Sequence, residues 1–129
     1  MSQEPVKKLS VLIVEDVDEM RELLVEFFSS FDRLSVIGAA RGVVEARTVV
    51  HRHRPGLVFL DEVLPGESSL DFHEELKTLK IPVVFLTGIS DRRAPLPEGA
   101  LGRLSKPGWK GWARIRPEVD NMLCQILFP

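Results

Sequence analysis

The chain has 129 residues and a formal net charge of −2, the size of a single domain without the basic excess that marks nucleic-acid-binding surfaces. No apolar stretch approaches the length that spans a membrane, and the polar start, Met1 to Lys8, lacks the apolar segment of a signal peptide. The single cysteine, Cys124, has no partner for a disulfide within the chain, which is typical of a reducing compartment. We therefore expect a cytoplasmic protein that binds neither nucleic acid nor membrane, with a flexible segment at residues 1–8 and one domain at residues 9–129.

Short apolar runs alternate with helical spacings along the chain, a pattern typical of repeated strand–helix units. The apolar runs predict strands at 9–14, 36–40, 57–60, 83–86 and 104–105. Apolar residues spaced three and four apart predict helices within 20–31, 43–50, 72–79 and 119–127, the last with Pro117 in its first turn. Strands that are apolar throughout are buried on both faces, so we predict an α/β fold with helices on both sides of a parallel sheet.

The interval from Ser90 to Gly102 departs from this regularity. It carries Pro95, Pro97 and Gly99 where a fourth helix is expected. A proline in a helix interior costs ~3 kcal/mol. We therefore predict a short helical turn or an irregular segment at this place.

Residues with chemically useful side chains stand where the predicted strands end. They are Glu15 and Asp16 after the first strand, Asp61 after the third, Thr87 after the fourth and Lys106 after the fifth. In an open parallel sheet, ligands bind outside the carboxyl ends of the strands, so these residues converge on one site. Three carboxylates, one hydroxyl and one amine are then expected in a single cleft.

These residue types indicate phosphoryl transfer. Carboxylates held together repel one another unless a cation lies among them, and Mg²⁺ takes oxygen ligands and bridges to phosphate. A carboxylate is a competent nucleophile that forms an aspartyl-phosphate. An ammonium and a hydroxyl stabilise the charge on the transferred group. We therefore predict phosphorylation of Asp61.

Four short motifs carry a resemblance to a known family. They are Val-Leu-Ile-Val-Glu15-Asp16, Leu-Val-Phe-Leu-Asp61-Glu-Val-Leu-Pro65-Gly66, Leu-Thr87-Gly88 and Leu-Ser-Lys106-Pro107. In this order, each at the end of an apolar run, they resemble the receiver domain of two-component response regulators, from about Leu9 to the last helix. The resemblance implies a doubly wound, flavodoxin-like (βα)5 fold with strand order 2-1-3-4-5, here with a short or irregular fourth helix.

The same resemblance implies roles for individual residues. Mg²⁺ would be held by Glu15, Asp16, Asp61 and the backbone carbonyl of Val63, whereas Asp61, Thr87 and Lys106 would carry the chemistry. The expected phosphodonor is a histidine kinase or a phosphotransfer protein, and the signal would leave by contact with a downstream protein. Beyond Mg²⁺-dependent self-phosphorylation and slow self-dephosphorylation, no enzymatic activity is expected.

The chain departs from the family pattern near its fifth strand. Receivers usually carry an aromatic residue three positions before the lysine, and here that residue is Arg103, which we expect to stay exposed or to pair with an acid such as Glu98. Ser69 replaces a common glycine, with an expected effect on loop geometry alone. The resemblance further implies a cis bond before Pro107. Val63 and Ile89, two residues beyond Asp61 and Thr87, are apolar and are expected to flank the phosphoryl group. Aromatic and basic residues mix in the last loop, so partner contact is expected at the fourth segment, residues 90–102, at a Trp109–Trp112 turn or at the first helix.

Two alternative functions follow from the same residues. A phosphatase of the haloacid dehalogenase type needs a second aspartate two residues after its nucleophile, and Val63 occupies that place. A pseudo-receiver, which binds partners without being phosphorylated, would be expected to lose the acids or the lysine, all of which are present here. Arg103 is the residue that keeps the pseudo-receiver open as an alternative.

Overall fold

The computed structural model describes residues 8–88, 94–106 and 111–128. Three predictions therefore lie outside the described residues: the isomer of the Lys106–Pro107 bond, the place of the Ile89 side chain and the Trp109–Trp112 turn.

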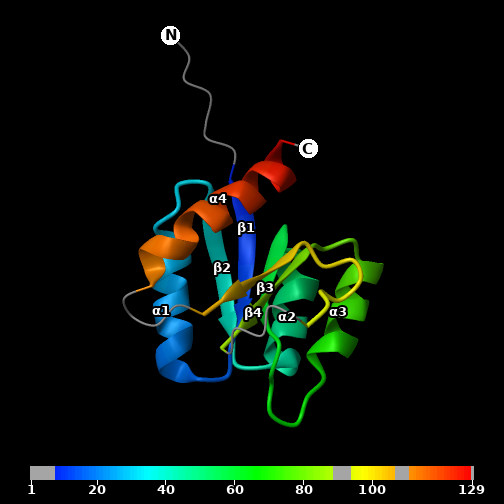
Figure 1. Ribbon diagram of the computed structural model, residues 1–129. Helices are drawn as coiled ribbons and strands as arrows, with labels where there is room; N and C mark the ends of the chain where they lie inside the picture. Colours follow the sequence, from blue (N-terminus) through cyan, green and yellow to red (C-terminus); the bar gives the residue numbers. More distant parts are fainter. Residues whose placement is uncertain (1–7, 89–93, 107–110, 129) are drawn as a thin grey trace.

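The predicted parallel sheet and its strand order are confirmed. The strands are β1 (Leu9–Val14), β2 (Leu34–Ala40), β3 (Leu57–Asp61), β4 (Val83–Thr87) and β5 (Gly102–Ser105), in the order β2-β1-β3-β4-β5 (Figure 1). The described helices are α1 (Asp18–Ser29), α2 (Val43–His53), α3 (Ser69–Thr78) and α4 (Trp112–Leu127). Among these helices, none has both the length and the apolar composition needed to cross a bilayer.

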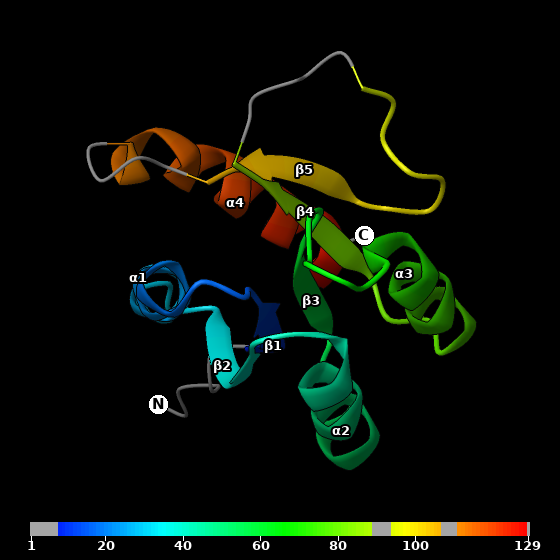
Figure 2. The same cartoon turned by 90° about the horizontal axis from the view of Figure 1, so that it is seen from below.

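Helices cover both faces of the sheet, with α1 and α4 on one side and α2 and α3 on the other (Figure 2). Successive residues of a strand point to opposite faces, and β3 shows the consequence. Leu57 and Phe59 join the core beneath α1 and α4, whereas Val58 and Leu60 join the core beneath α2 and α3. Burial on both sides explains why the strands read as continuous apolar runs.

The connection from β4 to β5 contains no helix in its described part, Gly88 and residues 94–101. The predicted irregular segment is thus confirmed over these residues. The Leu101 N–H donates to the Val83 carbonyl at 2.9 Å, and Lys77 Nζ of α3 donates to the Glu98 carbonyl at 3.1 Å. These contacts hold the 94–101 segment alongside β4 and α3.

The predicted start of the last helix was wrong. α4 begins at Trp112, so Pro117 lies inside the helix and not in its first turn. A proline there removes one N–H from the helix ladder, which is a local loss. The helix tolerates this loss because Ile115, Val119 and Leu123 are buried against the core beneath α1 and α4.

His73 of α3 makes the fold sensitive to mild acid. Its ring is buried with its edge against Phe85, at 5.2 Å between ring centroids, and burial lowers the pKa of His73 below its ordinary value of 6.5, with Lys77 acting in the same direction. The unfolded chain therefore takes up a proton that the folded chain does not. Stability that is complete above pH 6.5 is expected to fall as the pH drops below it.

Chemical denaturation of the parent and a His73→Gln variant at several pH values checks this expectation. The variant should lose the additional slope of unfolding free energy below pH 6.5. Equal slopes in the parent and the His73 variant would contradict the account.

Candidate functional site

Three acidic side chains meet at the carboxyl ends of β1 and β3. Glu15 and Asp16 directly follow β1, and Asp61 is the last residue of the neighbouring strand β3. One carboxylate oxygen from each of these three residues lies within 4.8 Å of the other two. Glu15 and Asp61 are buried and Asp16 is partly exposed. The predicted convergence of acids from separate strands is thus present in the structure.

Lys106 reaches the same cluster from the end of β5. Its Nζ lies 2.9 Å from Asp61 Oδ2 and 2.5 Å from Glu15 Oε1. The backbone N–H of Lys106 donates to the Thr87 carbonyl at 2.7 Å. This hydrogen bond holds the Lys106 backbone against the end of β4. The ammonium is therefore in direct contact with two of the three acids.

Charge balance at the site depends on these contacts. Burial raises the pKa of the Glu15 carboxyl above its ordinary value, an effect that Lys106 opposes and the Asp61 charge reinforces. Burial alone would lower the pKa of the Lys106 ammonium, but its contacts with Glu15 and Asp61 together raise that pKa. Among the described residues, Lys106 contacts two of the three acids. The three carboxylates offer hard oxygen donors that suit a divalent ion such as Mg²⁺.

Two other predicted residues lie at the rim of this cluster. Thr87 ends β4, one residue beyond the Leu86 that pairs with Asp61 in the sheet register. The Val63 N–H donates to Asp61 Oδ1 at 3.1 Å, whereas Val63 as a residue is 74% exposed. The loop after β3 therefore folds back over the carboxylate that the sequence predicts as nucleophile.

That loop is anchored by two side chains whose roles the sequence did not reveal. The Glu67 carboxylate accepts hydrogen bonds from the Val43 N–H at 3.0 and 3.2 Å, which caps the first turn of α2. The buried Ser69 hydroxyl donates to the Glu62 carbonyl at 2.8 Å. Ser69 thus fixes the loop directly after Asp61, which goes beyond the local change expected for a replaced glycine.

Gly42 leaves the space that the Glu67 cap occupies. A Cβ at Gly42 would clash with Glu67 Oε1, although the extended backbone of Gly42 would accept any residue. Gly42→Ala is therefore expected to displace the cap and lower the free energy of unfolding by about 1 kcal/mol. Denaturant unfolding of Gly42→Ala, of Glu67→Ala and of the double variant checks this. Both changes remove the same cap, so their losses of unfolding free energy should be strongly non-additive. Fully additive losses would refute the shared cause.

Comparison with known proteins decides the family. Residues 11–111 match the response regulator receiver domain. The chain belongs to this family. The carboxylates and Lys106 therefore lie at the strand ends of a receiver, and receivers generally bind Mg²⁺ at such an acidic pocket.

Similar proteins carry the receiver in longer chains. A protein-glutamate methylesterase/protein-glutamine glutaminase of Rhizobium etli is 38% identical over 104 residues, which cover 76% of this chain and 30% of that protein. A protein of the same name from Nitrosomonas europaea is 34% identical, with 78% of this chain and 30% of that protein covered. This receiver thus spans about a third of the length of these relatives.

Solved receivers share the fold. The response regulator domain of Thermotoga maritima CheB superposes with a TM-score of 0.77 at 18% identity and covers 95% of this chain and 99% of that one. The PhyR receiver domain of Erythrobacter litoralis gives a TM-score of 0.69 at 27% identity, with 95% and 92% covered. The flavodoxin-like architecture expected from the sequence is confirmed by these neighbours.

Arg103 of this receiver pairs with an acid, as expected, but the acid is Glu62 and not the Glu98 named as an example. Arg103 Nε donates to Glu62 Oε1, and both side chains are largely shielded, with 14% and 27% of their surface exposed. The expected pairing with an acid is present, but the acid lies 41 positions away in the sequence and is brought close by the sheet. The residue that follows the predicted phosphoacceptor is thus tied to β5.

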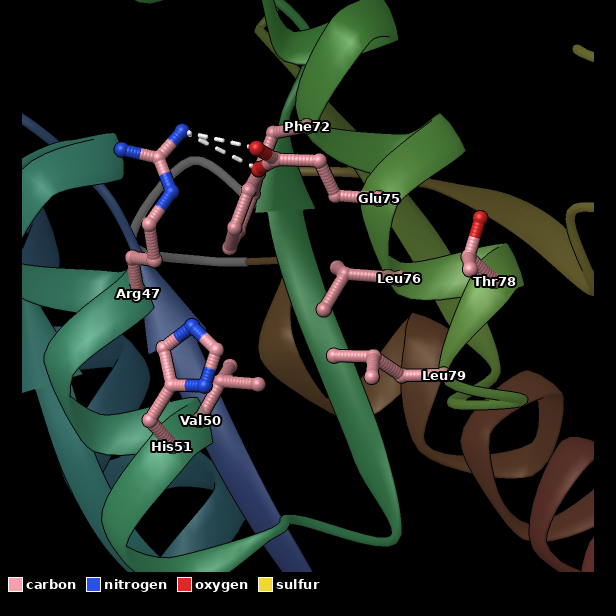
Figure 3. Close-up of a pocket in the computed structure, with 8 residues that line it drawn as sticks. All are labelled: Arg47, Val50, His51, Phe72, Glu75, Leu76, Thr78 and Leu79. Carbon is pink, nitrogen blue, oxygen red and sulfur yellow. Dashed lines mark hydrogen bonds and ion pairs between the residues drawn. The ribbon is translucent and has the colours of Figure 1, made fainter.

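A separate hollow of about 280 Å³ lies between α2 and α3 (Figure 3). Apolar side chains of Val50, Phe72, Leu76 and Leu79 line it, and Arg47 and Glu75 point toward each other across it at 3.0 Å. None of the strand-end acids lines this hollow. The groove and the strand-end acids are therefore separate features of this receiver.

Proposed function

We propose that this receiver accepts a phosphoryl group on Asp61 from a histidine kinase or a phosphotransfer protein. The observation that carries the proposal is the contact of Lys106 Nζ with Asp61 Oδ2 at 2.9 Å, beside two further acids within 4.8 Å. A cluster of this kind serves no evident purpose in stability, since buried like charges cost free energy. It suits a nucleophile whose charge is balanced by cations.

Each residue has a defined task in this proposal. The Asp61 carboxylate attacks phosphorus as the bond from phosphorus to the donor nitrogen breaks, which forms an acyl phosphate. Lys106 stabilises the charge on the phosphoryl oxygens, and Thr87 supplies a hydroxyl to the same group. Glu15, Asp16, Asp61 and the Val63 carbonyl would hold Mg²⁺, which neutralises phosphoryl charge when bound.

The signal then leaves by contact with another protein. We propose that residues 9–129 act as one receiver unit in the cytoplasm, where the exposed thiol of Cys124 would stay reduced. The phosphorylated state would be recognised by a downstream protein or by another domain.

A pseudo-receiver is the second candidate. The observation that favours it is Arg103 at the position of the usual aromatic residue, because an arginine that is hydrogen-bonded and paired with Glu62 cannot turn in as an aromatic ring does. Such a module would bind its partner while Asp61 stays unphosphorylated.

Intact mass measurement separates the two candidates. Purified protein is incubated with a small-molecule phosphodonor and either Mg²⁺ or a chelator. The proposal expects the mass of one phosphoryl group with Mg²⁺ and no gain with the chelator. An unchanged mass under both conditions, in protein whose fold is verified by circular dichroism, would favour the pseudo-receiver.

A further inference from the structure

We propose that Arg103 relays the charge state of Asp61 to the 94–101 segment. The inference rests on the proposed function, because it requires that Asp61 be phosphorylated. It assigns to Arg103 a task that the usual aromatic residue of receivers cannot perform, namely to hold an acid and two backbone carbonyls with one side chain.

The contacts of Arg103 span three strands of the sheet. Arg103 lies on β5 in register with Phe85 of β4, yet its Nε donates to Glu62, at the end of β3. Its Nη1 donates to the Ala94 carbonyl at 2.8 Å, and its Nη2 lies 3.4 Å from the Pro95 carbonyl. The guanidinium thus joins the residue next to Asp61 to the start of the 94–101 segment.

The segment depends on such side-chain contacts. Pro95 and Pro97 have no N–H to donate, and the hydrogen bonds of its described amides include Ala100 to the Pro97 carbonyl at 3.0 Å and Leu101 to the Val83 carbonyl at 2.9 Å. Segments with few backbone hydrogen bonds open at low free-energy cost. Loss of the Arg103 contacts is therefore expected to loosen the whole 94–101 segment.

Phosphorylation supplies the force that changes these contacts. A phosphoryl group adds about −1.5 to −2 charges, here one residue from Glu62, and an arginine remains charged throughout. The guanidinium is planar and rigid. If the phosphoryl group draws its Nε edge toward the end of β3, Nη1 and Nη2 move away from the Ala94 and Pro95 carbonyls. A hollow of about 330 Å³, lined by Thr87, Arg103, Ser105 and Glu118, lies beside the arginine.

Residue-resolved hydrogen exchange of the ¹⁵N-labelled chain tests the relay. Beryllofluoride with Mg²⁺ stands in for the phosphoryl group, and the Val63 amide, which donates to Asp61 Oδ1, reports that the site is occupied. In the parent chain, beryllofluoride is expected to speed exchange at Ala100 and Leu101 on the order of tenfold. In Arg103→Met the exchange should be fast both with and without beryllofluoride.

Two further variants separate the relay from general loosening. Arg103→Lys keeps the charge but loses the branched guanidinium that reaches Glu62 and both carbonyls. The exchange response of Ala100 and Leu101 should therefore disappear, while the Val63 amide signal still shifts. Lys77→Gln removes another contact to the same segment, from Lys77 Nζ to the Glu98 carbonyl, and should keep the tenfold response. A response that persists in both Arg103 variants, or its absence in the parent while Val63 shifts, would overturn the relay. No shift of Val63 in any protein would overturn the relay and the proposed function together.

Discussion

Asp61→Asn is expected to abolish the mass gain from a phosphodonor with Mg²⁺. The amide keeps the size of the side chain and its ability to accept from the Val63 N–H, but it removes the negative oxygen that attacks phosphorus. It also removes the anion that Lys106 contacts at 2.9 Å. Intact mass spectrometry after incubation with excess donor measures the result, which should be complete loss of the phosphorylated species.

The neighbouring acid provides the matched control for this variant. Glu62→Gln removes one negative charge one residue further along the chain, where the carboxylate pairs with Arg103 and not with the acidic cluster. It should take up one phosphoryl group as the parent does. A phosphorylated Asp61→Asn protein, or equal loss in both variants, would show that Asp61 is not the acceptor.

Much of the fold could be predicted because its signals are local. The run of apolar residues at 57–60 is buried on both faces by helices from opposite sides, so composition alone indicated a parallel strand there. The position of Asp61 at the end of that strand then placed it beside Glu15 and Asp16, since parallel strands end on one edge of the sheet.

The details that could not be predicted depend on register and on competing contacts. Arg103 meets Glu62 only because β4 and β5 align Phe85 with Arg103, and no local spacing encodes that alignment. Glu67 caps α2 from another loop, 24 residues away in sequence. The start of α4 at Trp112 went unnoticed because Pro117 is a strong local signal for a first turn, and burial of the apolar face of the helix outweighed it.

Lys106→Met is expected to separate the structural role of this lysine from its chemical role. The methionine keeps the apolar length of the side chain but leaves the fully buried Glu15 and the nearly buried Asp61 without their cation. Breaking a buried ion pair costs about 3–5 kcal/mol of unfolding free energy. Denaturant unfolding without divalent ions measures this loss. Lys77→Met, which removes an exposed pair with Glu74, should cost at most about 1 kcal/mol.

Two additions to the experiment distinguish the cause of the loss. If uncompensated charge is the cause, Glu15→Gln combined with Lys106→Met should be more stable than Lys106→Met alone, because one of the two orphaned carboxylates is gone. Mg²⁺ should likewise stabilise Lys106→Met more than the parent, since it supplies the missing positive charge. Phosphorylation of Lys106→Met should nevertheless remain slower by on the order of 10²–10³-fold at saturating Mg²⁺, because the phosphoryl oxygens still lack the ammonium. If Mg²⁺ restored both the stability and the phosphorylation rate of Lys106→Met, Lys106 would act only as a counterion of the acidic cluster.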